Sequence, residues 1–293
     1  MCSTRLEPAP AALGALPDTQ PTTRIGAQPA ARTPCETASE PAARTAQRLA
    51  LRRHQLVGLS QAGWRQVLAQ DWRADQRDCL QHWADHGLPL VLARQDLAQQ
   101  DPLDRWGSRC RMDLLALGLP APSHWYRQRL SLQLSLSAVQ YFDELPSAAE
   151  VAPLLPATQR AAWLGLCRDL RRLGLLPQVF GSFGWQQLTG LSYLRLGSDI
   201  DLLLPVDSPA QADAAAAVLV ASGIEQPRLD GELVFADGSA VAWREWQAWR
   251  KSPSRPGGDA QRILVKRLDG VTLEAGTAWL DRALRSLTPS CGG

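Results

Sequence analysis

The stretch from residue 176 to residue 205 constrains the fold most, because it carries two strands, a tight turn and a helix in one short run. Residues 176–180 are mostly apolar and predict a strand, and Gly181-Ser182 follows as a turn of small residues. A segment of helical length comes next, and an apolar run that contains Asp199 and Asp201 predicts the second strand. We expect the rest of the chain to be organised around this unit.

Asp199 and Asp201 form an acidic pair at the start of the second strand. Side chains at positions i and i+2 of a strand point to the same side, with their α-carbons about 7 Å apart. Carboxylate oxygens bind hard divalent cations, and a helix N-terminus attracts phosphate. We therefore predict that Asp199 and Asp201 bind Mg²⁺, with Mn²⁺ as an alternative, and that Gly181 and Ser182 bind phosphate. A solvated strand end and an ordinary tight turn are the alternative interpretations.

The residues of this stretch resemble those of a known superfamily. A Gly-Ser turn, a helix and then Asp-x-Asp on the next strand is similar to the nucleotidyltransferases related to DNA polymerase beta. The fuller pattern resembles a narrower family, the malonate decarboxylase holo-acyl-carrier-protein synthases, which are phosphoribosyl-dephospho-CoA transferases. This pattern consists of Gly181-Ser182, Gly184-Trp185-Gln186, Leu188-Thr189-Gly190, Tyr193-Leu194 and Ser198-Asp199-Ile200-Asp201-Leu202. Arg53-His54-x-Leu56-Val57 and residues 116–122 are similar to the N-terminal part of the same family.

The resemblance implies a specific reaction. A phosphoribosyl-dephospho-CoA prosthetic group would pass from its 5″-triphosphate precursor, triphosphoribosyl-dephospho-CoA, to a serine of the apo acyl carrier protein of malonate decarboxylase, and pyrophosphate would leave. Two alternatives stay open: a nucleotidyltransferase with another acceptor, and a catalytically silent nucleotidyltransferase-like module that only binds a partner.

A third carboxylate on a neighbouring strand usually completes a site of this kind. The candidates are Glu232, Asp237 and Glu245, and we favour Glu232 because it begins an apolar strand directly after an Asp-Gly pair. Arg244 and Lys266 lie on or beside predicted strands and are the expected phosphate contacts, with a charged strand edge as the alternative. The general base is left unassigned.

The chain divides into three predicted parts and belongs to the α+β class. Residues 1–50 are rich in Ala, Pro, Thr and Arg and predict a disordered extension. Residues 51–145 predict a small α+β module, since residues 129–136 alternate with period two and residues 89–94 form an apolar strand. Residues 146–293 predict a nucleotidyltransferase-like domain, a polymerase-beta-like mixed sheet with helices.

Further local signals fill in this last part. Ser208-Pro209 predicts the start of a helix that continues over residues 211–221. The three Asp-Gly pairs Asp230-Gly231, Asp237-Gly238 and Asp269-Gly270 predict hairpin turns. A final helix is predicted over residues 277–286.

Composition excludes several classes of partner. A net charge of +2 disfavours nucleic acid, and no apolar segment reaches the roughly 18 residues of a membrane span. The 6 cysteines are scattered without a C-x-x-C pair, which indicates reduced thiols and a cytoplasmic protein. His82 and His86 have the i,i+4 spacing of a helical metal site, but the sequence offers no third ligand.

Overall fold

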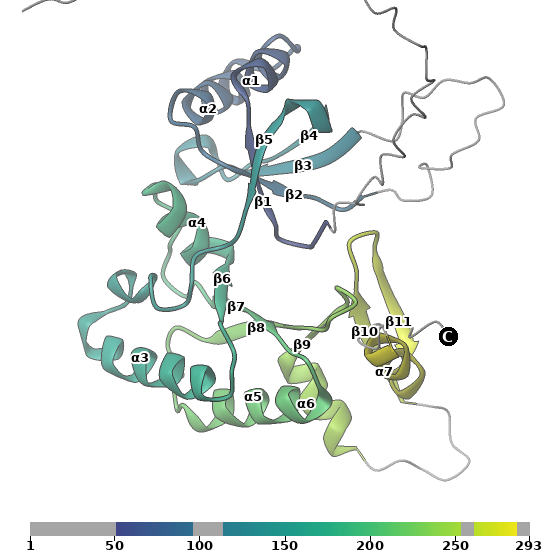
Figure 1. Ribbon diagram of the computed structural model, residues 1–293. Coiled ribbons are helices and arrows are strands. Elements are labelled where there is room, and N and C mark those ends of the chain that lie inside the picture. Colours follow the sequence, from purple (N-terminus) through teal and green to yellow (C-terminus); the bar gives the residue numbers. More distant parts are fainter. Residues whose placement is uncertain (1–50, 96–113, 253–260, 286–293) are drawn as a thin grey trace, which may run out of the picture. The chain divides into compact units, whose positions relative to one another are not determined.

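The computed structural model describes residues 51–95, 114–252 and 261–285. These residues form two sheets, each with its own hydrophobic core and helices, so the α+β class is confirmed (Figure 1). The predicted disorder of residues 1–50 lies outside the described residues. None of the described helices is long and apolar enough to cross a membrane.

The first sheet is antiparallel throughout, with the strand order β4-β3-β2-β1-β5. Its strands are β1 (Leu56–Leu59), β2 (Leu90–Leu92), β3 (Leu114–Pro120), β4 (Arg129–Ser135) and β5 (Val139–Asp143). Strand β4 buries every second side chain, as its period-two pattern predicts. Helices α1 (Gln61–Leu68) and α2 (Ala74–Asp85) contribute Trp64, Leu80 and Trp83 to the core of this sheet.

The second sheet has the order β11-β10-β9-β8-β7-β6. Its strands are β6 (Gln178–Phe180), β7 (Ile200–Pro205), β8 (Leu229–Val234), β9 (Ala240–Ala242), β10 (Arg262–Lys266) and β11 (Val271–Ala275). All neighbours are antiparallel except β7 and β8, which helix α5 (Pro209–Ala221) connects as a crossover. Because β7 and β8 are parallel, their first residues lie at the same edge of the sheet.

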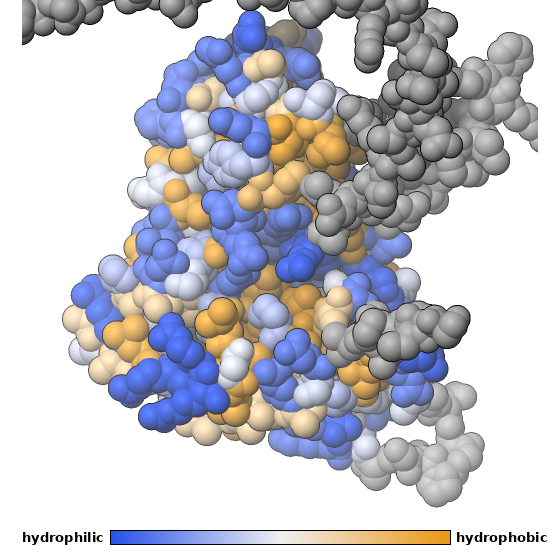
Figure 2. Space-filling view, in the orientation of Figure 1, coloured by the Kyte–Doolittle hydropathy of each residue, from blue (hydrophilic) through white to orange (hydrophobic). Residues whose placement is uncertain are grey.

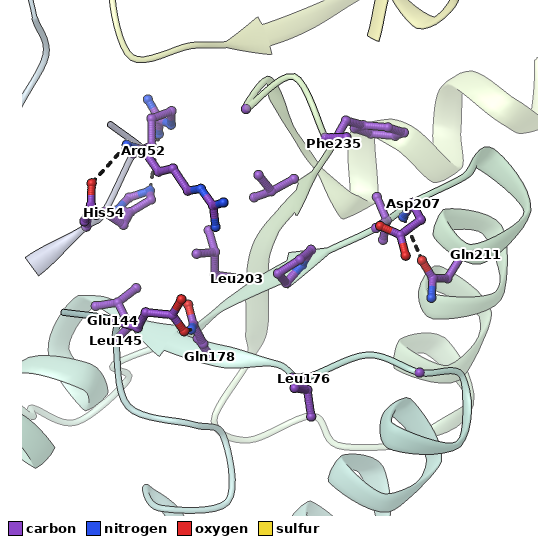
Figure 3. A pocket seen from close by; sticks show the side chains of 18 of the residues that line it. Arg52, His54, Glu144, Leu145, Leu176, Gln178, Leu203, Asp207, Gln211 and Phe235 are labelled. Carbon is purple, nitrogen blue, oxygen red and sulfur yellow. Dashed lines mark hydrogen bonds between the residues drawn. The ribbon is translucent and has the colours of Figure 1, made fainter. Parts of the chain in front are cut away.

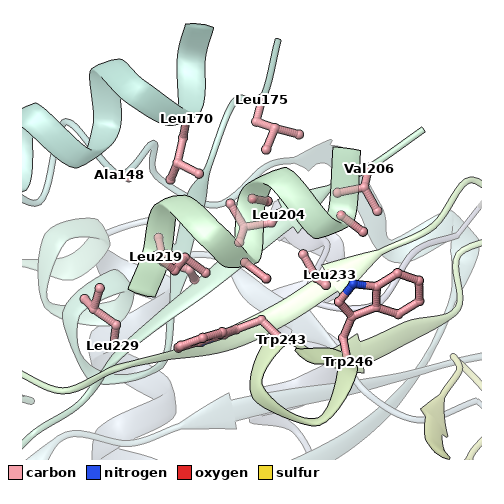
Figure 4. Packing of buried hydrophobic residues seen from close by; sticks show 14 of the residues in the cluster. Ala148, Leu170, Leu175, Leu204, Val206, Leu219, Leu229, Leu233, Trp243 and Trp246 are labelled. Atoms are coloured by element: carbon pink, nitrogen blue, oxygen red, sulfur yellow. The ribbon is translucent and has the colours of Figure 1, made fainter. Parts of the chain in front are cut away.

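The helices of the second half, together with its sheet, form one large core. They are α3 (Ala157–Arg172), α4 (Gly181–Thr189), α5, α6 (Trp243–Lys251) and α7 (Gly276–Arg285), and all five contribute buried residues. Figure 4 shows Leu204 and Leu233 of the sheet among residues of α3, α5 and α6. Helix α3 turns Trp163 inward, and its other side is hydrophilic (Figure 2). Alternate residues of β7 and β8 therefore face away from this core, and Asp201 is among them.

One predicted turn is wrong. Gly231 is not in a hairpin turn but inside β8, paired with Leu202 of β7. Its φ of 141° and its close approach to β7 both require glycine, because an added Cβ would lie 2.1 Å from the Leu202 carbonyl oxygen. The pairs Asp237-Gly238 and Asp269-Gly270 do connect neighbouring antiparallel strands, as predicted.

Short 3-10 helices link several of these elements. They are Ser123–Trp125, Leu136–Ala138 and Ala152–Leu154. The last of these precedes α3, so the segment predicted as one or two helices before β6 contains a short helix and a long one.

Candidate functional site

Asp201 is the central residue of the candidate site. It is the second residue of β7, and the strand register places it beside Asp230 of β8 on one side and Phe180 of β6 on the other. Cross-strand neighbours project to the same face of a sheet. The two carboxylates of Asp201 and Asp230 therefore share the face of the sheet that points away from the large core.

Helix α4 begins against the Asp201 carboxylate. Its first residue, Gly181, has a φ of 63°, and a Cβ at this position would lie 1.9 Å from Asp201 Oδ2. Only glycine combines this backbone conformation with such a close approach. Ser182 follows in the first turn, partly buried, and its hydroxyl makes no hydrogen bond to any other described residue. The sequence prediction that a Gly-Ser turn lies beside the acidic strand agrees with this arrangement.

The Asp201 carboxyl is in an environment that opposes its ionisation. Burial raises its pKa, and the negative charges of Asp230, Asp199 and Glu232 raise it further, while Lys266 lowers it. The result is a pKa of about 6. A carboxylate that is held among other carboxylates gains stability from a bound cation.

Asp199 lies one residue before β7 and contacts Arg228. The Arg228 Nε atom is 3.5 Å from Asp199 Oδ2, and its Nη2 atom is 3.2 Å from Asp230 Oδ2. One guanidinium thus bridges two of the three carboxylates. Asp199 and Asp201 are close enough to interact electrostatically, although only Asp201 belongs to the strand itself.

Glu232, which we expected to bind a metal ion, is surrounded by basic side chains of the protein. Its side chain is buried and accepts hydrogen bonds from Arg53 Nη2 at 3.2 Å and Lys266 Nζ at 2.8 Å, and His54 Nε2 lies 3.4 Å away. Burial alone would raise its pKa, but His54, Arg53 and Lys266 together outweigh burial and lower it to about 2. Glu232 is therefore a carboxylate whose charge is already balanced.

His54 has an unusual conformation at this cluster. Its φ is 62°, a value that a non-glycine residue seldom adopts, and its ring stacks on Phe180 with the centroids 4.3 Å apart. Its neighbour Arg53 reaches Glu232 from a position 179 residues away in the chain. The predicted site residue Lys266 is thus joined by two residues, Arg53 and His54, that our choice of site residues did not include.

The other expected residues have structural roles elsewhere. Asp237 accepts hydrogen bonds from the Ser239 backbone and hydroxyl at 2.9 and 2.6 Å, and Glu245 accepts one from the Leu264 backbone at 2.7 Å. Arg244 donates to the Leu229 carbonyl at 3.0 Å and lies over the Trp243 ring. The structure brings Lys266 to the acidic face of the sheet but does not show Arg244 in contact with it.

Asp230 is the carboxylate that the sequence analysis missed. The Asp-Gly pair was interpreted as a turn, yet Asp230 and Glu232 lie on one strand with the i,i+2 spacing that also relates Asp199 and Asp201. That repeated acidic spacing was the available signal. Gly231 obscured it because glycine after aspartate is typical of hairpin turns.

The oxygen atoms of the three carboxylates are of the kind that binds a divalent cation. No group of three His, Cys, Asp or Glu side chains within the described ranges is arranged to hold a metal ion as it stands. The raised pKa of Asp201 and the guanidinium bridge from Asp199 to Asp230 nevertheless indicate that this edge of the sheet favours positive charge. Asp199, Asp201 and Asp230 are the residues that could hold such an ion.

A cavity of about 630 Å³ extends along the same face of the sheet (Figure 3). Arg52 and His54 lie at one end, Asp207 and Gln211 lie at the other, and Leu203 of the sheet lies between them (Figure 3). Leu203 is two residues beyond Asp201 on β7, so this part of the lining lies about 7 Å along the strand from Asp201, although Asp199, Asp201 and Asp230 do not themselves line the cavity.

Comparison with known proteins agrees with the resemblance noted in the sequence. Residues 52–144 match the family described as the phosphoribosyl-dephospho-CoA transferase MdcG N-terminal domain, and residues 144–276 match the corresponding C-terminal domain. No solved structure matches the chain significantly, so the polymerase-beta-like form of the sheet stays a prediction.

Curated relatives cover most of both chains. A phosphoribosyl-dephospho-CoA transferase of Xanthomonas campestris pv. campestris is 37% identical over 200 residues, which is 68% of this chain and 84% of the relative. Proteins of the same name from Xanthomonas euvesicatoria and Bradyrhizobium diazoefficiens are 36% and 34% identical, over 73% and 75% of this chain and 89% and 88% of theirs. The chain therefore belongs to the phosphoribosyl-dephospho-CoA transferase family.

Proposed function

We propose that this protein transfers a phosphoribosyl-dephospho-CoA group from its 5″-triphosphate precursor to a serine of the malonate decarboxylase apo acyl carrier protein. The serine oxygen attacks the α-phosphorus, the bond from this phosphorus to the bridging oxygen of the β-phosphate breaks, and pyrophosphate leaves. The family membership supports the donor. The observation that carries the proposal is the Asp201 carboxylate, which lies beside Asp230 and against the first residue of helix α4.

The carboxylates Asp199, Asp201 and Asp230 are the residues that would hold Mg²⁺ or Mn²⁺, and Asp230 replaces Glu232 in this role. Bound there, the ion would offset the negative charge of the triphosphate and of the departing pyrophosphate. Asp201 and Asp230 project from neighbouring strands that start at one edge of the sheet, so their spacing is set by the register of the strands rather than by a loop.

The positive groups of the site are the proposed phosphate contacts. The Gly181 backbone N–H and the Ser182 hydroxyl lie at the start of α4, where backbone N–H groups are unpaired. Lys266 and Arg53 share one carboxylate, Glu232, so the pair keeps an excess of positive charge close to Asp201. Arg244 is left out of this set because its guanidinium binds the Leu229 carbonyl and lies over Trp243.

Mass spectrometry of the carrier protein tests the proposal. The apo acyl carrier protein is incubated with the full-length protein, Mg²⁺ and triphosphoribosyl-dephospho-CoA, with Asp201→Asn and Asp199→Asn in parallel and Glu245→Gln as a control. We expect a mass gain equal to the donor minus pyrophosphate, lost in both aspartate variants and kept in the control.

Other outcomes select between the alternatives. Pyrophosphate release from the donor or another nucleotide without modification of this carrier protein would indicate a nucleotidyltransferase with another acceptor. Neither modification nor pyrophosphate release from any donor would indicate a module that binds a partner without catalysis. Genes for malonate decarboxylase subunits beside the gene for this chain would favour the first acceptor.

A further inference from the structure

The cavity beside the carboxylates has the position and lining of a binding site for one defined part of the donor. We propose that it binds the adenine base of the dephospho-CoA moiety, with the exocyclic amino group directed at Asp207. The identity of the donor rests on the proposed function; the choice of adenine rests on the cavity itself.

The cavity lies at a suitable distance from the reacting group. Leu203 and Pro205 follow Asp201 on β7, and a strand rises about 3.3 Å per residue, so they lie roughly 7 and 13 Å from Asp201 along the strand. In phosphoribosyl-dephospho-CoA the added phosphoribosyl unit is joined to the adenosine. With the α-phosphorus at Asp201, one ribose separates it from the adenosine, which then lies over Leu203 and Pro205.

The lining of the cavity leaves apolar surface unburied. Leu176 is 68% exposed although it is a large apolar residue, and Pro205 beside it is exposed as well. Val234 adds a partly buried aliphatic side chain from the neighbouring strand. Small-molecule sites are commonly about 300–1,000 Å³ in volume. This cavity of about 630 Å³ lies in that range and combines apolar side chains with charged and polar ones. A flat heterocyclic ring would cover these side chains.

The far end of the cavity presents a hydrogen-bond acceptor. The Asp207 backbone N–H donates to Gln211 Oε1 at 2.8 Å (Figure 3). Gln211 Nε2 donates in turn to the Leu173 carbonyl at 2.9 Å, so the backbone of Asp207 is held in place. The Asp207 carboxylate itself accepts no hydrogen bond from another residue in the part of the chain that the structure describes. A free carboxylate suits an amino group, because it accepts hydrogen bonds and donates none.

Charge along the cavity excludes phosphate from the Asp207 end. Arg52, Arg53 and His54 line the end nearer to Asp201, where the phosphates of the donor would lie, and the carboxylates Asp143 and Glu144 line the cavity there as well. At the other end a phosphate would meet the Asp207 carboxylate without a cationic partner, which is electrostatically unfavourable. An uncharged group with an amino donor is favoured there, and adenine has one on its edge.

Binding measurements with the full-length protein test this inference without the carrier protein. Calorimetry compares dephospho-CoA with a dephospho-CoA in which hypoxanthine replaces adenine, for the wild type, Leu176→Glu and Asp207→Asn. Leu164→Glu is the matched control, because Leu164 is also an exposed leucine, 45% accessible, but lies on helix α3 and does not line the cavity. Adenosine monophosphate and 4′-phosphopantetheine are then tested as competitors.

We expect Leu176→Glu to weaken dephospho-CoA binding at least about tenfold, and Leu164→Glu to leave it unchanged. The hypoxanthine compound, which presents a carbonyl oxygen to Asp207, should bind the wild type about tenfold more weakly than dephospho-CoA does. In Asp207→Asn this difference should fall below about threefold, because asparagine can donate to that oxygen. Adenosine monophosphate should displace dephospho-CoA.

Three results would overturn the inference. They are wild-type affinity in Leu176→Glu, equal affinity of the wild type for the two bases, and displacement by 4′-phosphopantetheine alone, which would assign the cavity to the pantetheine arm. Failure of the proposed function is separate: a protein that binds dephospho-CoA as expected but modifies no carrier protein would keep the adenine site and lose the transfer reaction.

Discussion

Asp201 and Glu232 lie on adjacent strands of the same sheet face, yet their environments are opposite. Asp201 is surrounded by Asp199 and Asp230, and burial together with these charges raises its pKa to about 6. Glu232 is more deeply buried, but Arg53, His54 and Lys266 lower its pKa to about 2. Two carboxylates on adjacent strands therefore have pKa values of about 6 and about 2.

The difference separates a residue that holds the structure together from one that is available to a ligand. A buried carboxylate with several cationic partners has its charge satisfied by the protein, and removing it leaves those cations unpaired. A carboxylate among other carboxylates has a perturbed pKa that the protein alone does not relieve, which is typical of functional sites. We therefore interpret Glu232 as an anchor between the two halves of the described chain and Asp201 as the functional acid.

The largest expected effect is on transfer activity. Asp201→Asn removes the central carboxylate, and we expect the rate of carrier-protein modification to fall at least about 1,000-fold. Asp213→Asn is the control, since Asp213 pairs with Arg250 on the helical side of the sheet and should keep wild-type activity. A loss of less than tenfold in Asp201→Asn would remove this residue from the reaction.

Glu232→Gln should mainly affect stability. The change leaves Arg53 and Lys266 without their carboxylate, and we expect the free energy of unfolding, measured in urea at neutral pH, to fall by about 3 kcal/mol. Glu274→Gln is a matched control, because Glu274 also binds two arginines but at a more exposed position, where the cost should stay below about 1 kcal/mol. Equal losses in the two variants would contradict the anchor role.

The acidity of Glu232 adds a pH dependence to this result. Its pKa is lowered in the folded state from 4.5 to about 2, so its contribution to stability is present above pH 4.5 and is lost as the pH falls toward 2. The stability difference between wild type and Glu232→Gln should shrink over that interval.

Gly181→Ala tests the contact between helix α4 and the functional acid. The new Cβ would collide with Asp201 Oδ2, and we expect transfer to fall about 100-fold, the cost of displacing a reacting group by about 1 Å. Gly190→Ala is the matched control: Gly190 has a similar φ of 71°, but nothing lies within 4 Å of an added Cβ. Both variants should lose stability from the left-handed backbone conformation, Gly181→Ala more than Gly190→Ala because of the collision, and only Gly181→Ala should lose activity.

The smallest effect concerns the charge of Asp201 itself. Its folded pKa is raised from 3.8 to about 6, so its stabilising contribution is complete below pH 3.8 and is lost as the pH rises through 6. Asp201→Asn avoids this loss and should be more stable than wild type by about 1–2 kcal/mol at pH 7.5, with no gain near pH 4. Urea unfolding with EDTA present measures the difference; a constant difference across this range would contradict the raised pKa.

Local features of the fold were predictable because their signals are local. The alternation in β4, the Ser208-Pro209 start of helix α5 and the turns at residues 237–238 and 269–270 all depend on a few adjacent residues. The sequence predicted that Gly181 lies near Asp201, but it did not predict the close contact between them, because that contact depends on how β6 pairs with β7.

The rest of the site depends on pairing between distant segments, which one sequence does not reveal. Asp230 joins Asp201 only because β7 and β8 are parallel, whereas the Asp-Gly pair favoured a hairpin. Glu232 was predicted as a metal ligand from its place after an Asp-Gly pair, and its partners Arg53 and His54 were missed because they come from the other half of the chain. The composition of the site was therefore partly predictable, and its charge balance was not.

The contact between Arg53 and Glu232 has a consequence for biosynthesis. Its two residues are 179 positions apart, and translation adds about 5–20 residues per second, so Arg53 leaves the peptidyl transferase centre roughly 10–35 s before its partner. During this interval the first sheet can form, but the ionic connection to β8 cannot. A nascent chain is thus unable to complete the candidate site until most of the message has been read, which delays donor binding to a late stage of synthesis.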